Sequence, residues 1–387
     1  MMISKLIIIP YVILIVFLPL FLIESSAAEI TATPAITFKV EYDDNINFDS
    51  KDEIDDFSGS AIPGLKLNYL TELLEFNISG ELDVKRYLDK TDFDRTNQLY
   101  RFNSKYKMLE RLNLLGEFEY RKDETIDSQL EETGRVFTLA RRERYYADGG
   151  LRYQISELSE VGPNFSYEKT NYSSKDDDDY DLYQISLTYT KEFQNQRDTI
   201  NLIPSYAKYN SDVQDADGYR FEVDWIHLLG ETLTSNILFG PRYTRIDRKD
   251  NDNTDTDWGG IGKIEIAKKG ETFIGNIGYS HDVRSSSQGE IIQVDRLYLN
   301  FDKRIWERFG AKFDGSGYYS NNVSGNKEKF TYFVLTPSIY YMLTEYHLLE
   351  LFYSYQNQVE MGEPGNPTSQ RNRIWLNLKL EFPKKWN

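Results

Sequence analysis

The segment 374–382, close to the end of the chain, reads IWLNLKLEF. Apolar residues occupy every second position, and mostly polar residues stand between them: Ile374, Leu376, Leu378, Leu380 and Phe382 against Trp375, Asn377, Lys379 and Glu381. A period of two is typical of a β-strand with two different faces. The same alternation recurs at 36–42, 74–84, 112–120, 183–189 and 333–341. These segments are about nine to fifteen residues long, which suits tilted strands that cross a bilayer.

Short and long connections alternate along the chain. The short ones are at 71–72, 110–111, 157–158, 194–196, 230–231, 270–271, 307–308 and 344–345. The longer ones, rich in Asp, Asn, Ser and Gly, are at 43–60, 91–95, 123–134, 173–179, 210–218, 247–257, 285–289, 321–327 and 361–369. This predicts an all-β fold, a transmembrane antiparallel up-and-down β-barrel of about eighteen strands, or about sixteen, in the outer membrane. A soluble two-sheet sandwich is the alternative, but it would expose large apolar patches to water.

Aromatic residues cluster near the ends of the predicted strands. Examples are Tyr42, Tyr69, Tyr87, Tyr120, Tyr172, Trp225, Trp258, Tyr279, Tyr319 and Trp375. In a barrel they would form two interfacial girdles, because an amphipathic ring is favoured at headgroup depth. For any single one, an ordinary packed aromatic is the alternative.

The composition excludes several classes of protein. The chain has 387 residues, no cysteine and a formal net charge of −17. Its 29 Tyr and 22 Phe are too many for a disordered acidic chain. The absence of cysteine excludes disulfides and thiolate metal sites and fits passage through an oxidising periplasm. The acidic balance argues against nucleic acid as a partner, because phosphate binding needs clustered Lys and Arg.

The N-terminus predicts an export signal. Lys5 precedes an apolar run over 6–23, and small residues follow before Glu29. We therefore expect a signal peptide over residues 1–28, cleaved after Ala28, and a mature barrel over residues 29–387. A retained membrane anchor is the alternative, because the apolar run approaches the length that spans a bilayer.

Several strand openings resemble a known family. The stretches are VEYDDNI at 40–46, DDF at 55–57, IPGLKLNY at 62–69, VGP at 161–163 and GPRY at 240–243. They resemble outer-membrane barrels of the beta-barrel porin type, and the similarity covers essentially the whole mature chain. The resemblance implies an outer-membrane barrel, and members of the family are often linked to exopolysaccharide export or exosortase sorting systems. Its motifs are structural and bring no catalytic residues.

The sequence offers little catalytic chemistry. The three histidines, His227, His281 and His347, are too scattered for a readable metal site, and no G-x-S-x-G motif is present. We expect no enzyme activity and no cofactor. The acidic runs 176–179 and 250–257 allow a calcium interpretation. The second run lacks the central glycine and closing glutamate of an EF-hand loop, so solvated acidic loops are the simpler interpretation.

Charged residues on the polar side of the alternation are candidates for lining an internal channel. The main candidates are Lys66, Lys85, Arg101, Lys105, Arg152, Arg220, Glu222, Asp224, Asp314, Glu350 and Lys379. Lys39, Asp83, Lys107, Glu117, Arg121, Glu168 and Lys312 belong to the same set. Charges of both signs across a wet pore set a transverse field and a selectivity. Paired charges that only hold the barrel in shape are the alternative.

These patterns predict a passive channel. A barrel of sixteen to eighteen strands leaves an aqueous interior, which suits small polar solutes or a secreted polysaccharide. Tyr298, Tyr318 and Tyr340 are candidates for stacking on sugar rings. The alternative is a non-conducting scaffold barrel that binds a partner of a polysaccharide export system through its loops. The expected partners are outer-membrane lipid and the barrel-insertion machinery, because the chain ends in an amphipathic strand. The oligomeric state is open.

Overall fold

The computed structural model describes residues 28–136, 138–249, 253–323, 328–361 and 366–386. The predicted signal peptide falls almost entirely on residues outside these ranges. None of the helices among the described residues is long and apolar enough to span a bilayer.

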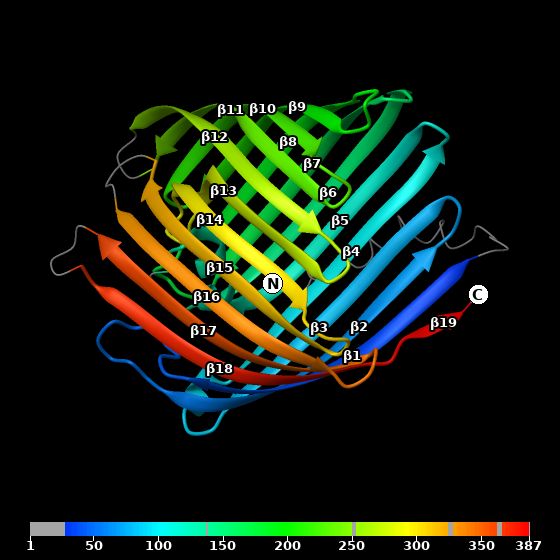
Figure 1. Cartoon of the computed structure of the whole chain (residues 1–387). Coiled ribbons are helices and arrows are strands. Elements are labelled where there is room, and N and C mark those ends of the chain that lie inside the picture. The colour runs from blue at the N-terminus through cyan, green and yellow to red at the C-terminus, as the bar shows by residue number, and fades with distance from the viewer. Residues whose placement is uncertain (1–27, 137, 250–252, 324–327, 362–365, 387) are drawn as a thin grey trace, which may run out of the picture.

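The described residues are almost entirely β-strand (Figure 1). The strands are β1 (Glu29–Asp43), β2 (Asp56–Leu70), β3 (Leu74–Tyr87), β4 (Arg95–Leu109), β5 (Leu112–Glu124), β6 (Arg141–Ser156), β7 (Ser159–Tyr172), β8 (Tyr180–Glu192), β9 (Asp198–Ser211), β10 (Gln214–Leu228), β11 (Leu233–Arg248), β12 (Thr254–Lys269), β13 (Phe273–Ser285), β14 (Ile291–Arg304), β15 (Phe309–Asn322), β16 (Lys329–Met342), β17 (His347–Met361), β18 (Thr368–Glu381) and β19 (Lys384–Trp386). The helices are η2 (Thr91–Phe93) and α2 (Thr125–Thr133).

The sheet closes on itself. Each of the strands β1 to β18 pairs antiparallel with its neighbours in this series, and β1 pairs with β18 from Ala35 opposite Glu381 to Asp43 opposite Arg373. The short β19 continues that seam on β1 beyond Pro383. Figure 1 shows the seam as blue β1 beside red β18 and β19. The prediction of a closed antiparallel barrel is confirmed, with eighteen long strands where about eighteen, or sixteen, were expected.

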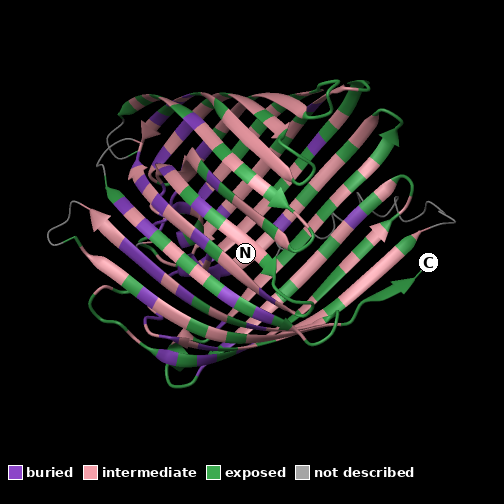
Figure 2. Ribbon diagram, in the orientation of Figure 1, coloured by how far each residue is buried: buried purple, intermediate pink, exposed green. Residues whose placement is uncertain are grey.

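Exposure alternates along each strand. On β1, Phe38 and Val40 are 46% and 62% exposed, whereas Glu41 and Asp43 are 1% and 0% exposed. The outward face is therefore the apolar one, the reverse of a soluble protein. Figure 2 shows the alternation as green bands between pink and purple ones. Such an apolar outer belt is stable against hydrocarbon, while the alternate residues of each strand face a polar interior.

Aromatic side chains form two outer girdles, one at each end of the strands. Toward the loops, Tyr206, Tyr219, Tyr243 and Trp258 contact one another in a row across β9 to β12. Toward the short turns, Phe273, Phe301 and Phe313 stack across β13 to β15. Amphipathic rings are favoured at headgroup depth.

Three aromatics that the sequence places in the girdles lie instead on the inner face. Tyr87 is opposite Ser58, Tyr172 is opposite Arg142, and Trp375 is opposite Glu41. The girdle assignment was wrong for them, because closeness to a strand end does not fix which face a residue occupies.

Two predicted loops are also corrected. The expected long loop at 210–218 is a turn at 212–213, because β9 and β10 continue almost to each other. The expected loop at 123–134 contains the end of β5 and helix α2.

Candidate functional site

Helix α2 interrupts the connection between β5 and β6. It spans nine residues, TIDSQLEET, and its two apolar residues Ile126 and Leu130 are four positions apart, so they share one face. Gly134 ends it in the left-handed conformation, with φ of 72° and its N–H donating to the Leu130 carbonyl. This is the usual glycine stop of a helix. A Cβ on Gly134 would also collide with Tyr318.

The helix crosses the lumen. At its first turn, Arg95 on β4 forms ion pairs with Glu124 and Asp127. At its last turn, Arg284 on β13 donates to the Glu132 carbonyl over 2.7 Å. β4 and β13 are nine strands apart in a ring of eighteen, on opposite walls of the barrel. A segment that contacts both must pass through the interior.

An apolar cluster holds one side of α2. Ile126 and Leu130 pack with Phe48 of the β1–β2 connection, with Ile292 and Val294 of β14, and with Tyr318 and Tyr332. Leu130 and Ile292 are 0% exposed. Burial of a Leu or Ile side chain contributes roughly 1.5–3 kcal/mol. The cluster therefore fills the β14 to β16 side of the lumen near the loops.

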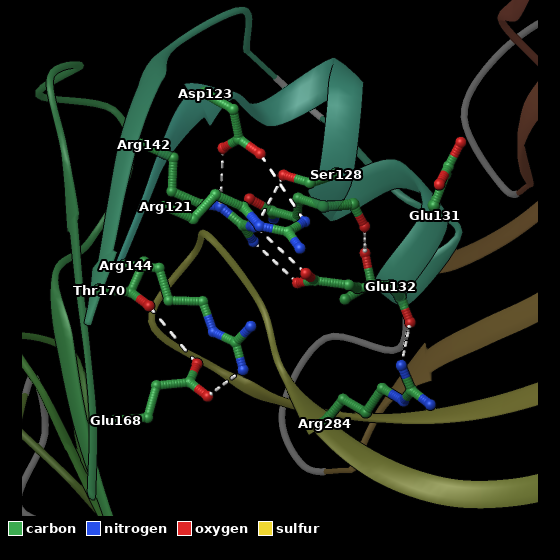
Figure 3. Close-up of polar contacts among 12 residues, drawn as sticks. Arg121, Asp123, Ser128, Glu131, Glu132, Arg142, Arg144, Glu168, Thr170 and Arg284 are labelled. Atoms are coloured by element: carbon green, nitrogen blue, oxygen red, sulfur yellow. Dashed lines mark hydrogen bonds and ion pairs between the residues drawn. The ribbon is translucent and has the colours of Figure 1, made fainter. Parts of the chain in front are cut away.

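Buried arginines bond to the opposite side of α2 and to the residues that follow it. Arg142 donates to the Ser128 hydroxyl at 2.7 Å and to both Glu132 oxygens at 2.8 and 3.1 Å, as Figure 3 shows. Beyond the helix, Arg135 is fully buried, bonds Asn322 at 2.6 Å and Glu328 at 3.1 Å, and stacks over Phe330. Bidentate arginine pairs of this kind fix orientation as well as position.

The ion pairs set the charge of the helix at neutral pH. Burial alone would raise the pKa of Glu132, but the Arg142 guanidinium outweighs it and the pKa is lowered. The pKa of Asp127 is lowered in the same way, since Arg95 outweighs burial. Both carboxylates are therefore ionised at pH 7 and keep α2 attached to β4 and β6.

Two loops meet across the mouth of the barrel. Asp178 donates its backbone N–H to the Ser287 carbonyl over 2.7 Å, so the β7–β8 connection touches the β13–β14 connection. The Asp177 carboxylate accepts a hydrogen bond from Thr138, just beyond α2. Burial raises the pKa of Asp177. The sequence allows a calcium interpretation for the acidic run 176–179. In the structure this run joins two loops, through the hydrogen bonds of Asp177 and Asp178.

A polar cavity of about 350 Å³ lies beside the C-terminal half of α2. It is lined by Glu132 and Thr133 of the helix and by residues of β6 to β13, among them Arg144, Glu168, Arg220 and Arg284. Arg144 pairs with Glu168 at 2.7 Å, and Tyr180 donates to the same carboxylate at 2.8 Å. Figure 3 shows Arg144, Glu168 and Arg284 facing this space.

A second cavity of about 280 Å³ lies beside the N-terminal half of the helix. Its lining is acidic, with Glu81, Asp83, Asp123 and Asp127 against Arg121. Helix α2 therefore runs between an acidic region on β3 to β5 and an arginine-rich region on β6 to β13.

A comparison of the sequence with protein-family models finds no match, and a comparison with curated protein sequences finds none either. The fold, by contrast, matches solved structures. OccK2 (OpdF) from Pseudomonas aeruginosa aligns with a TM-score of 0.50 at 9% identity over 93% of this chain and 98% of that chain. OccAB1 from Acinetobacter baumannii aligns at 0.49 and 10% identity, over 91% and 97%. The outer membrane protein OpdK from P. aeruginosa aligns at 0.48 and 9% identity, over 92% and 99%.

The chain is an outer-membrane β-barrel. Its closed strand ring and apolar belt agree with the shared fold. The strand pairing of this barrel places all eleven candidate channel residues on the inner face, which is the face away from lipid. Only Arg220 among them lines the cavity beside α2.

Most of the other candidates are already paired or lie nearer the turns. The ion-paired ones are Lys85 with Glu41, Arg101 with Glu119, Arg152 with Glu160, Glu350 with Lys312, and Lys379 with Glu381. Asp224 accepts from Asn201 at 2.9 Å. No ion pair within 4 Å involves Lys66, Lys105, Glu222 or Asp314 among the described residues, and the two lysines are exposed.

The three candidate sugar-stacking tyrosines are buried. Tyr298, Tyr318 and Tyr340 are less than a tenth exposed in the outer-membrane barrel. Their hydroxyls donate to Glu265, to the Glu131 carbonyl and to Asp302. The rings are covered as well, by Arg296 over Tyr298 and Tyr318 and by Lys312 over Tyr340. Their faces are not free to stack on a sugar.

Two histidines lie on the lipid-facing side. His227 and His281 each bond a single aspartate at 2.7 Å, Asp198 and Asp295. In the described ranges, no three His, Cys, Asp or Glu side chains are grouped as metal ligands would be.

The sequence interpretation missed the arginines that surround α2. Arg135, Arg142, Arg144 and Arg284 were not singled out. Arg142 and Arg144 continue the inner-face alternation of β6, which could have placed them. Ile126 and Leu130 followed by Gly134 give a helix signal inside the acidic loop, but no local pattern predicts that the helix enters the lumen.

Proposed function

We propose that the protein is a passive outer-membrane channel for small polar solutes, narrowed by α2. The observation that carries this proposal is the helix held across the lumen with a polar cavity of about 350 Å³ beside it. A barrel of eighteen strands has an interior wider than side chains alone can fill. A solute would enter past the loops, pass the cavity and leave through the turn end.

The inner charged residues give the proposed path its polar lining. Near the turn end, Lys66 and Lys105 stand exposed on the inner face, and Glu222, Asp224, Asp314 and Glu350 also lie in that half. A wet, charged vestibule lowers the cost of moving a hydrated solute out of bulk water. These residues would form the wider part of the channel.

Size and surface chemistry favour small solutes over a polymer. The cavity beside α2 is at the lower end of the range for small-molecule sites, about 300–1,000 Å³. The inner tyrosines that could stack on successive sugar rings are buried and hydrogen-bonded. The proposal assigns the chain no catalytic role.

Planar-bilayer recordings of the purified barrel test the proposal. We expect steady ohmic conductance, and a several-fold higher conductance when residues 125–134 are replaced by a flexible linker of equal length. A folded barrel that conducts no ions in either form would refute the channel.

A scaffold barrel is the second candidate. The observation that favours it is the packing of the loop end, where Phe48 and α2 share one apolar cluster and the β7–β8 and β13–β14 connections touch. A packed loop end offers a fixed surface to a protein partner, and the sequence resemblance implies that this partner belongs to a polysaccharide export system. Co-purification of such a partner with a non-conducting barrel would favour this function over the channel.

A further inference from the structure

We infer that the passage beside α2 selects small anions, and that Arg284 is the uncompensated cation that sets this selectivity. The inference rests on the proposed channel and names the class of solute that it passes.

Charge pairing leaves one excess positive charge in the cavity. The lining contains Arg144, Arg220 and Arg284 against Glu132 and Glu168. Glu168 is neutralised by Arg144 at 2.7 Å, and Glu132 by Arg142, which does not line the cavity. Arg220 has Asp282 at 3.3 Å. Arg284 has no carboxylate within 4 Å among the described residues.

Arg284 is held in place by the helix. Its guanidinium donates to the Glu132 carbonyl at 2.7 Å, in the last turn of α2 (Figure 3). The C-terminus of a helix carries roughly half a negative charge. The dipole of the helix thus offsets only part of the full charge on Arg284. Among the described residues the Arg284 guanidinium makes no other hydrogen bond, so its remaining N–H groups can contact a solute in the cavity.

One residue on the neighbouring strand β14, Arg296, adds to the positive potential. Arg296 bonds the Ser316 hydroxyl and lies over the faces of Tyr298 and Tyr318. It has no carboxylate within 4 Å in the part of the chain that the structure describes. Glu131, which points away from the Arg142 group in Figure 3, is the one carboxylate of α2 on that side.

The acidic cavity at the other end of α2 does not cancel this field. Asp127 is paired with Arg95 at 3.2 Å, and Asp123 lies 3.5 Å from Arg142. Glu81 and Asp83 remain on β3, ten strands from β13 in one direction and eight in the other. Charges more than about 10 Å apart across water are strongly screened at 0.1 M salt. The electrostatic potential in the cavity beside Arg284 therefore stays positive.

The residues that line the cavity also indicate which functional groups the anion has. Gln184, Thr244 and Ser285 offer neutral hydrogen-bonding groups around the arginines. A guanidinium binds a carboxylate in a fixed planar geometry, and amide and hydroxyl groups suit hydroxyls. The cavity therefore fits a small hydroxylated carboxylate better than a large or apolar anion.

Reversal potentials in a KCl gradient test the sign of the selectivity. We expect chloride to be favoured over potassium, and the R284Q variant to reduce that preference by about threefold at 0.1 M salt. The R284K variant should behave like the original protein, because it keeps the charge. R245Q removes an exposed arginine from the outer face and should change nothing.

Liposome swelling extends the test to organic solutes of one size. Gluconate, sorbitol and glucosamine are hydroxylated six-carbon solutes that are anionic, neutral and cationic. We expect gluconate to enter fastest and glucosamine slowest, with the order lost in R284Q. Heat-modifiable migration on gels confirms that each variant is folded. A conducting barrel that prefers cations, or whose selectivity is the same in R284Q, would overturn the inference and leave the channel standing. The absence of any conductance would defeat both.

Discussion

Near the loops, the inner-face arginines Arg142, Arg242 and Arg371 are no more than 1% exposed, whereas near the turns the inner-face lysines Lys66 and Lys105 are exposed. All five occupy the same face of the same sheet. The loop end has a core of its own, built on α2 and the β1–β2 connection, and the turn end is open. Depth along the strand, and not the face alone, decides whether an inner charge is structural or available to a solute.

The largest effect is expected when a carboxylate is introduced into the barrel interior, once near the loops and once nearer the turns. L130D puts a carboxylate into the apolar cluster, where an unpaired charge costs several kcal/mol. We expect α2 to leave the wall and the single-channel conductance to rise by at least about twofold. L238D alters an inner position nearer the turns, between Asp224 and Lys263, and should leave the conductance close to that of the original protein. Equal effects of the two variants would contradict the contrast.

A smaller effect is expected from one buried arginine. R135A removes the guanidinium that joins residues beyond α2 to Asn322 and Glu328. We expect a local loss of about 2–3 kcal/mol, because neighbouring polar groups lose their buried partner. Limited proteolysis between residues 130 and 140 should become faster. K105A, at the open end, should leave the digestion pattern unchanged.

A still smaller difference in stability is expected between alanine variants of two glycines. Gly134 has φ of 72° and lies against Tyr318, whereas a methyl group added to Gly149 on β6 would meet no neighbouring atom within 4 Å. G134A should destabilise the end of α2 by about 1–2 kcal/mol, and G149A should be neutral. Hydrogen exchange of the α2 amides measures both. Equal exchange in the two variants would show that the glycine stop is unimportant.

The smallest effect is expected from moderate acid. The pKa values of Asp127 and Glu132 are lowered from 3.8 and 4.5, so their ion pairs are complete above those values and are lost only as pH falls through the lower folded values. The conductance should therefore stay nearly constant from pH 7 to pH 5 and rise only below about pH 4. A rise already complete at pH 5 would mean that other groups hold the helix.

The alternation in 374–382 and its repeats predicted the barrel and the inner face for the eleven candidate residues, and the alternating short and long connections predicted about eighteen or sixteen strands. Period two is a local property that survives in any register, so the sequence alone carries it. Only the tertiary structure decided that α2 crosses the lumen, that Tyr298, Tyr318 and Tyr340 are covered, and that Arg284 has no carboxylate partner among the described residues. Those outcomes depend on contacts such as Arg135 with Asn322, between residues 187 positions apart. Closure of the ring creates such contacts, and no local pattern encodes them.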